Sequence, residues 1–115
     1  MIIGIGCDIV TISRIEQAID KPVIQKILTP REKEVADKLK GHRKSEWIAG
    51  RFAAKEAIYK AIHTVEDCTI LDIEILNNEQ GAPVCTCFPA YEIMISIAHE
   101  KETAIAYALA QTKES

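Results

Sequence analysis

The sequence predicts an α+β domain in which an antiparallel sheet packs against one long helix. Three observations lead to this fold class: Met1–Val10 is a mostly apolar run, Ser45–His63 is the strongest helical pattern, and strand-like segments dominate the remainder. The chain has 115 residues, 48% of them apolar, with no internal repeat and no linker. This length suits one hydrophobic core, so we expect residues 1–115 to form a single domain.

The N-terminal part is expected to hold one strand and two short helices. The run Met1–Val10 is typical of a strand buried on both faces, and the two glycines within it would permit close backbone packing. A short helix is expected to begin at Thr11 or Ser13, and a second one to cover Val23–Leu28. These elements lead into a stronger helix signal.

A capping box marks the start of the next helix. Thr29 suits the N-cap, Pro30 the first helical position, and Glu32 the third, where its side chain can return to the cap. This helix is expected to end near Gly41, a residue suited to the left-handed conformation that often follows a helix.

The long helix carries a carboxylate on its apolar face. On a helical wheel of about 100° per residue, Glu56 lies about 40° from Phe52, and Lys60 follows one turn later at the edge of the apolar arc. A carboxylate at this position indicates either a pairing partner or a function.

The C-terminal half is expected to form antiparallel strands. Thr69–Leu76 alternates between apolar and polar residues, and Gly81 lies in a turn-forming segment after it. The other strands are expected over Val84–Phe88, Ile93–Ala98 and Thr103–Ala110, the last two joined at His99–Glu102.

Charge and composition exclude several classes of protein. The net charge of −3 argues against non-specific nucleic-acid binding, and the basic cluster Lys38–Lys44 suits either a discrete anionic ligand or a solvated face. The uncharged apolar stretches fall short of the roughly 20 residues of a membrane span, and no signal peptide is apparent, so a cytoplasmic location is expected. The four cysteines lack zinc-site spacing and are expected to be buried thiols.

Asp8 and Glu56 are the candidate metal ligands. A carboxylate within an apolar strand is costly unless it is paired, bonded or bound to a cation, although Asp8 could also cap the following helix. Glu56 could make an ordinary surface pair with Lys60. Together, two carboxylates and a lysine would suit Mg²⁺ holding a substrate phosphate. Arg43, Lys44 and Arg51 could bind phosphate or simply flank a helix start. His99, at the end of an expected strand, could be a partly exposed turn residue or have a function.

Four motifs lie in order along the whole chain. They are Ile3-Gly4-Ile5-Gly6-Cys7-Asp8-Ile9-Val10, Ala49-Gly50-Arg51-Phe52-Ala53-Ala54-Lys55-Glu56-Ala57-x-x-Lys60-Ala61, Asp72-Ile73-Glu74-Ile75 followed by Asn78-x-x-Gly81-x-Pro83, and Ser96-Ile97-Ala98-His99-Glu100. Together they resemble the holo-[acyl-carrier-protein] synthases, the small branch of the 4′-phosphopantetheinyl transferases. The resemblance is most specific over residues 50–61.

This resemblance implies an activity and a set of ligands. The implied reaction transfers 4′-phosphopantetheine from coenzyme A to a serine of apo acyl carrier protein, releases adenosine 3′,5′-bisphosphate and requires Mg²⁺. It also implies a homotrimer with active sites at the subunit interfaces. Attack by a serine hydroxyl on a diphosphate requires charge neutralisation and in-line positioning, which a metal and a few cationic side chains supply.

The resemblance also assigns roles to individual residues. It implies metal binding by Asp8 and Glu56, with Lys60 stabilising the phosphate and the leaving group. It implies coenzyme A contacts for Arg43, Arg51, Lys60, Pro83 and His99, and a carrier-protein contact for Arg14.

The sequence leaves the proton acceptor and the coenzyme A affinity open. Either Glu56 or a metal-bound water near Asp8 could accept the serine proton. The chain departs from the family pattern at His63–Cys68, which lacks glycines, and at Ala82 and Ala98, so altered coenzyme A affinity is expected. A non-catalytic trimeric module that binds a nucleotide or carrier protein, and a metal-dependent phosphohydrolase, are the alternative functions.

Overall fold

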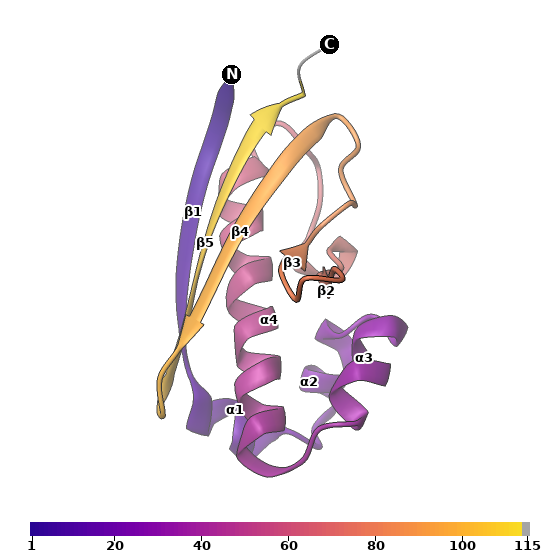
Figure 1. Cartoon of the computed structure of the whole chain (residues 1–115), viewed down its shortest axis with the longest axis vertical. Helices are drawn as coiled ribbons and strands as arrows, with labels where there is room; N and C mark the ends of the chain where they lie inside the picture. Colours follow the sequence, from indigo (N-terminus) through magenta and orange to yellow (C-terminus); the bar gives the residue numbers. More distant parts are fainter. Residues whose placement is uncertain (114–115) are drawn as a thin grey trace.

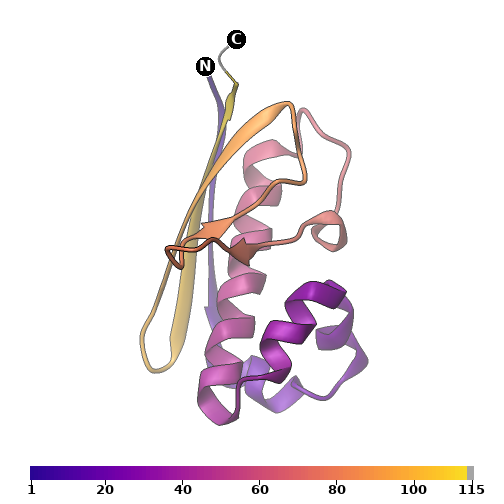
Figure 2. The ribbon, with the colours of Figure 1, turned by 45° about the vertical axis from the view of Figure 1, so that its right-hand side comes forward.

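The structure is a computed structural model that describes residues 1–113. The fold is built on a three-stranded antiparallel sheet. The strands β1 (Ile2–Thr11), β5 (Thr103–Thr112) and β4 (Tyr91–His99) lie in that spatial order. Helix α4 (Gly41–Ile62) runs along one face of the sheet (Figure 1). Figure 2, in which the sheet is nearly edge-on, shows all the helices on that same side. The predicted α+β class is confirmed.

Helix α4 approaches the sheet closely because β1 presents glycines to it. A Cβ atom on Gly4 would lie 1.9 Å from the carbonyl oxygen of Ala61, and one on Gly6 would lie 2.1 Å from that of Ala57. Any side chain would collide with helix backbone, so the predicted close packing is confirmed. The strand is not buried on both faces as predicted, since Ile5 is 69% exposed on the side away from the helix.

Three short helices follow β1: α1 (Ile12–Ala18), α2 (Pro22–Ile27) and α3 (Pro30–Asp37). The capping box of α3 is confirmed, since the backbone N–H of Thr29 donates to Glu32 Oε1 at 2.8 Å and that of Glu32 donates to Thr29 Oγ1 at 3.2 Å. The predicted end of this helix near Gly41 is wrong. Gly41 has a φ of +59° as expected, but it begins α4, which is therefore longer at its N-terminus than predicted.

The strand predicted over Thr69–Leu76 is wrong. The segment holds a 3₁₀ helix, η1 (Ile70–Asp72), and only its end joins β2 (Leu76–Asn77). Backbone N–H groups that would bond to a neighbouring strand donate to side chains instead. The N–H of Thr69 donates to Asp72, and that of Ile75 donates to Glu32.

The strand predicted over Val84–Phe88 is also mostly wrong. It is reduced to β3 (Pro83–Val84), which pairs with β2. The turn between β2 and β3 is confirmed, with Gly81 at a φ of +83°. The two long C-terminal strands are confirmed as β4 and β5.

A fully buried ion pair joins the helices to the segment before β2. Both Lys55 and Glu32 are 0% exposed, and Lys55 Nζ donates to Glu32 Oε1 at 2.5 Å and to the carbonyl oxygen of Ile27 at 2.5 Å. Glu32 also accepts from the backbone N–H groups of Thr29 at 2.8 Å and Ile75 at 2.7 Å. Every oxygen of the carboxylate is bonded, as a buried charge requires.

The cysteines are free thiols as predicted, but they are not uniformly buried. Cys85 is buried, and burial raises its pKa to about 12. Cys7 is exposed, because its side chain lies on the face of β1 away from α4. Among residues 1–113, no helix combines the length and apolar character that crossing a membrane requires.

Candidate active site

Asp8 and Glu56 meet at one cavity, although they come from β1 and from the middle of α4. The cavity has a volume of about 520 Å³ and is also lined by Phe52 and by Arg14 of α1. Asp8 lies on the same face of β1 as the glycines that allow α4 to approach. The close contact of strand and helix therefore brings the two carboxylates together.

The surroundings of Glu56 in this cavity disfavour its charged form. The pKa of Glu56 is raised above its ordinary value, first by burial and then by the negative charge of Asp8, while Lys60 opposes the shift. The ammonium of Lys60 lies 3.3 Å from Asp8 Oδ1 and donates to the carbonyl oxygen of Cys7 at 3.0 Å. Lys60 thus pairs with Asp8 rather than with Glu56, and Arg14 is the other cationic side chain at the cavity.

This arrangement differs from both structural alternatives raised by the sequence. Thr11, not Asp8, is the N-cap residue of α1, and its side chain makes no capping bond. The ion pair of Lys60 joins it to another element of the fold, so it is not a pair within the helix.

The donor set suits Mg²⁺. Carboxylate oxygens are hard ligands, and Mg²⁺ usually takes one or two of them with phosphate and water completing its shell. Within residues 1–113, no cluster of three or more His, Cys, Asp and Glu side chains forms a metal cage of protein ligands alone. The raised pKa of Glu56 also indicates an electrostatic environment that a cation would relieve.

A second cavity, of about 290 Å³, holds the other predicted ligand contacts. Arg43, Arg51, Pro83 and His99 all line it, and they come from α4, from the start of β3 and from the end of β4. Lys60 lines neither cavity and instead borders a third one beside Tyr107. The predicted residues are therefore gathered into separate groups within the chain.

Arg51 is held rigidly at the second cavity. Arg51 is only 5% exposed. Its guanidinium lies 4.3 Å from the ring centre of Trp47, and Nη2 donates to Asn77 Oδ1. Its Nε is buried without a hydrogen-bond partner. Burial lowers the pKa of Arg51 and the charge of Glu32 raises it in part, but an arginine remains charged.

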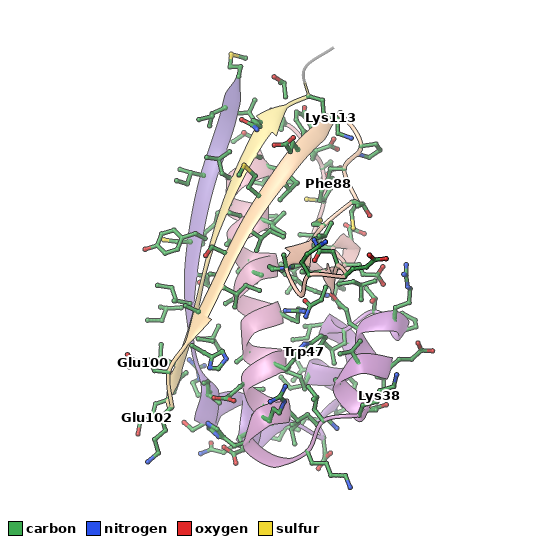
Figure 3. The ribbon with its side chains drawn as sticks, in the orientation of Figure 1. Lys38, Trp47, Phe88, Glu100, Glu102 and Lys113 are labelled. Atoms are coloured by element: carbon green, nitrogen blue, oxygen red, sulfur yellow. The ribbon has the colours of Figure 1, made fainter. Side chains whose placement is uncertain are left out.

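Trp47 and Asn77 are site residues that the sequence did not reveal. Trp47, labelled in Figure 3, extends from α4 on the side of α3. Its spacing of four residues from Arg51 was a usable signal, since side chains four apart meet on a helix. Asn77 is distant in sequence from Arg51 and gave no such signal.

Comparisons with known proteins agree with this fold. Residues 4–111 match the 4′-phosphopantetheinyl transferase superfamily. A holo-[acyl-carrier-protein] synthase of Bacillus cereus (strain G9842) is 46% identical over 110 residues, covering 92% of each chain. That of Bacillus thuringiensis (strain Al Hakam) is 41% identical and covers 100% of each chain.

Solved structures give the same result. The holo-(acyl-carrier-protein) synthase of Bacillus anthracis str. Ames, in complex with CoA (3′,5′-ADP), superposes with a TM-score of 0.90 at 43% identity, covering 98% of this chain and 99% of that one. The Helicobacter pylori enzyme in complex with coenzyme A superposes with a TM-score of 0.77 at 30% identity, covering 93% and 99%. The chain belongs to the 4′-phosphopantetheinyl transferase superfamily and, within it, to the holo-[acyl-carrier-protein] synthases.

Proposed function

We propose that this protein transfers the 4′-phosphopantetheine group of coenzyme A to a serine of apo acyl carrier protein, with Mg²⁺ as cofactor and adenosine 3′,5′-bisphosphate as the second product. The observation that carries this proposal is the meeting of Asp8 and Glu56 at one cavity, beside Lys60, in a member of this family. We also propose that residues 1–115 form one transferase domain.

Mass spectrometry tests the reaction directly. Apo acyl carrier protein incubated with the enzyme, coenzyme A and Mg²⁺ is expected to gain the mass of one phosphopantetheine group. A phosphohydrolase would instead release that group into solution, and a binding module would leave both substrates unchanged. Either of these results would contradict the transferase proposal.

The side chains at and beside the first cavity have different roles in the proposed reaction. Asp8 and Glu56 would hold Mg²⁺, which supplies positive charge at the diphosphate when it is bound. As the serine oxygen bonds to the β-phosphorus, the bond from phosphorus to the nucleotide's phosphate oxygen breaks. The serine proton needs an acceptor, and the Glu56 carboxylate at the same cavity is the chain's own candidate. The ammonium of Lys60 stabilises the charge that leaves with the nucleotide.

The second cavity is proposed to hold the nucleotide of coenzyme A and its 3′-phosphate. Arg43, Arg51 and His99 provide cationic and hydrogen-bonding groups, and Pro83 forms part of the wall. Arg51 is oriented by Trp47 and Asn77 before any ligand arrives, which reduces the entropy lost on binding.

Lys60→Met is expected to reduce turnover by about 30- to 1000-fold, or about 2–4 kcal/mol, because a lost contact to developing charge acts mainly on the transition state. Methionine keeps the length and helix propensity of the side chain, so folding is retained. Turnover and coenzyme A affinity should be measured separately. A variant within threefold of wild-type turnover would show that Lys60 only pairs with Asp8.

Arg14→Glu is expected to raise the KM for acyl carrier protein and to leave that for coenzyme A nearly unchanged. Arg14 lines the carboxylate cavity from α1, where an acidic carrier protein could dock. The effect should diminish with added salt, because salt screens attraction between exposed charges. Lys33→Glu, at an exposed position of α3, makes the same charge change as a control. Equal effects of Arg14→Glu on both KM values would remove Arg14 from the docking surface.

We also propose a homotrimer with sites at its interfaces. The sheet face away from α4 is apolar and uncovered: Ile5, Ile9, Met94 and Tyr107 are 69%, 66%, 55% and 51% exposed. Contiguous exposed apolar surface of this kind is typical of an interface. In such a trimer, the second cavity of a neighbouring chain would lie next to the first cavity of this chain, which would bring the two groups of site residues together.

Sedimentation equilibrium is expected to give three times the 12.8 kDa mass of the chain. Tyr107→Lys places a charge in the middle of the sheet face and is expected to lower the measured mass. A wild-type protein that sediments as a monomer at micromolar concentration would contradict the trimer.

A further inference from the structure

One carboxylate stands out in the second cavity. Glu46 lines this cavity beside Arg43, Arg51 and His99, and its side chain is 22% exposed. A negative charge here opposes any phosphate that the cationic side chains attract. Its presence at a proposed anion site therefore calls for a specific role.

Glu46 lies against two histidines at once. Its Oε2 is 3.3 Å from His99 Nδ1 and 3.7 Å from His42 Nε2. His42 in turn lies 2.9 Å from the carbonyl oxygen of Lys101 through Nε2, and its Nδ1 is 3.6 Å from a carboxylate oxygen of Glu16. The contacts join α1 and the first turns of α4 to the hairpin between β4 and β5.

The contact with His99 has a chemical consequence. An ionised carboxylate only accepts hydrogen bonds, so the ring nitrogen that faces it is the one that carries a proton. Nδ1 of His99 is therefore the nitrogen whose proton faces Glu46. A phosphate oxygen also only accepts hydrogen bonds, so Nε2 must carry a proton as well when it binds a phosphate. A carboxylate partner of this kind sets both the orientation and the tautomer of a histidine.

We infer that Glu46 is a positioning residue that acts through His99, fixing the ring so that Nε2 is presented to the nucleotide phosphate. The inference rests on the proposed function, because it takes the second cavity as the nucleotide site.

The hairpin has anchors that do not involve Glu46. The backbone N–H of Ile12 donates to the carbonyl oxygen of Glu102 at 2.9 Å, and that of Glu100 donates to the carbonyl oxygen of Thr103 at 2.8 Å. Removing the Glu46 side chain is therefore expected to leave the fold in place, which allows its effect on His99 to be measured.

The direction of the binding change separates positioning from simple charge. If Glu46 acted only as a nearby charge, Glu46→Ala would strengthen binding of an anion, because repulsion is removed. Positioning predicts the opposite, a weakening of about three- to tenfold, since a charge-assisted contact to phosphate loses its geometry. Glu46→Gln keeps an acceptor and removes the charge, so it is expected to bind at least as tightly as wild type.

A double-mutant cycle with adenosine 3′,5′-bisphosphate, followed by calorimetry, tests the inference. His99→Ala is expected to weaken binding by about tenfold, and the double variant with Glu46→Ala to bind no worse than His99→Ala alone. Glu16→Ala, which removes a carboxylate from the same cluster without touching His99, serves as the control and should bind normally. Additive effects of Glu46→Ala and His99→Ala would overturn the inference.

Nitrogen-15 NMR of the histidine rings provides a readout that a purely structural role would not change. With adenosine 3′,5′-bisphosphate bound, the wild-type spectrum is expected to show His99 protonated at both ring nitrogens, and that of Glu46→Ala to show a ring protonated at only one. A ring that stays doubly protonated in Glu46→Ala would overturn the inference. If His99→Ala leaves nucleotide binding intact, the cavity assignment and the inference fail together. If His99→Ala weakens binding while Glu46→Ala does not, the inference alone fails.

Discussion

Glu56→Gln and Asp8→Asn are each expected to lower phosphopantetheine transfer to the level measured without Mg²⁺ while leaving the fold intact. Both substitutions keep the size of the side chain and remove one of the two anionic ligands. Because the pKa of Glu56 is raised by burial and by Asp8, the charged pair is unfavourable without a cation. Thermal stability in the absence of metal should therefore stay the same or rise slightly.

Metal binding can be followed independently of activity. Titration with Mn²⁺, monitored by electron paramagnetic resonance, should show weaker binding in both variants. Glu34→Gln on the exposed side of α3 makes the same chemical change away from the cavity and should behave as wild type. Near-normal turnover of both site variants at limiting Mg²⁺ would exclude these carboxylates as the metal ligands.

Lys55→Met is expected to destabilise the protein by about 3–5 kcal/mol, because it leaves the buried carboxylate of Glu32 without its countercharge. The remaining bonds from Thr29 and Ile75 satisfy hydrogen-bonding capacity but do not neutralise the charge. Urea unfolding followed by circular dichroism measures the loss as a lower transition midpoint.

Two further variants identify the cause. Glu32→Gln combined with Lys55→Met removes both charges and should be more stable than Lys55→Met alone, since no uncompensated ion remains buried. Lys33→Met alters an exposed lysine next to Glu32 in sequence and should change stability by less than about 0.5 kcal/mol. A loss below about 1 kcal/mol for Lys55→Met would mean that the pair is poorly desolvated.

The features predicted well from sequence are those with local signals. Thr29 and Glu32 form their capping box within four residues, and the helix wheel placed Glu56 on an apolar face, where it lines the cavity with Phe52. Asp8 was conspicuous because it interrupts an apolar run. In each case, neighbouring residues contain the information that fixes the structure.

The features missed depend on residues far apart in the chain. Thr69–Leu76 alternates like a strand, yet the N–H of Ile75 bonds to Glu32 rather than to a neighbouring strand. The same long-range bonding buries Lys55, which the wheel gave no reason to single out. The partners of Arg51 show both situations: Trp47 lies one helical turn away, whereas Asn77 is brought in only by the fold.

The uncovered sheet face links the stability of this protein to its amount. In the proposed trimer, Ile5 and Tyr107 leave water only when chains meet, so part of the free energy that holds each fold comes from mass action. Dilution would then act as a mild denaturant, with no change in sequence, temperature or solvent. A substitution on that face would weaken the fold by shifting the concentration at which chains separate, even where the separate chain loses no internal contact.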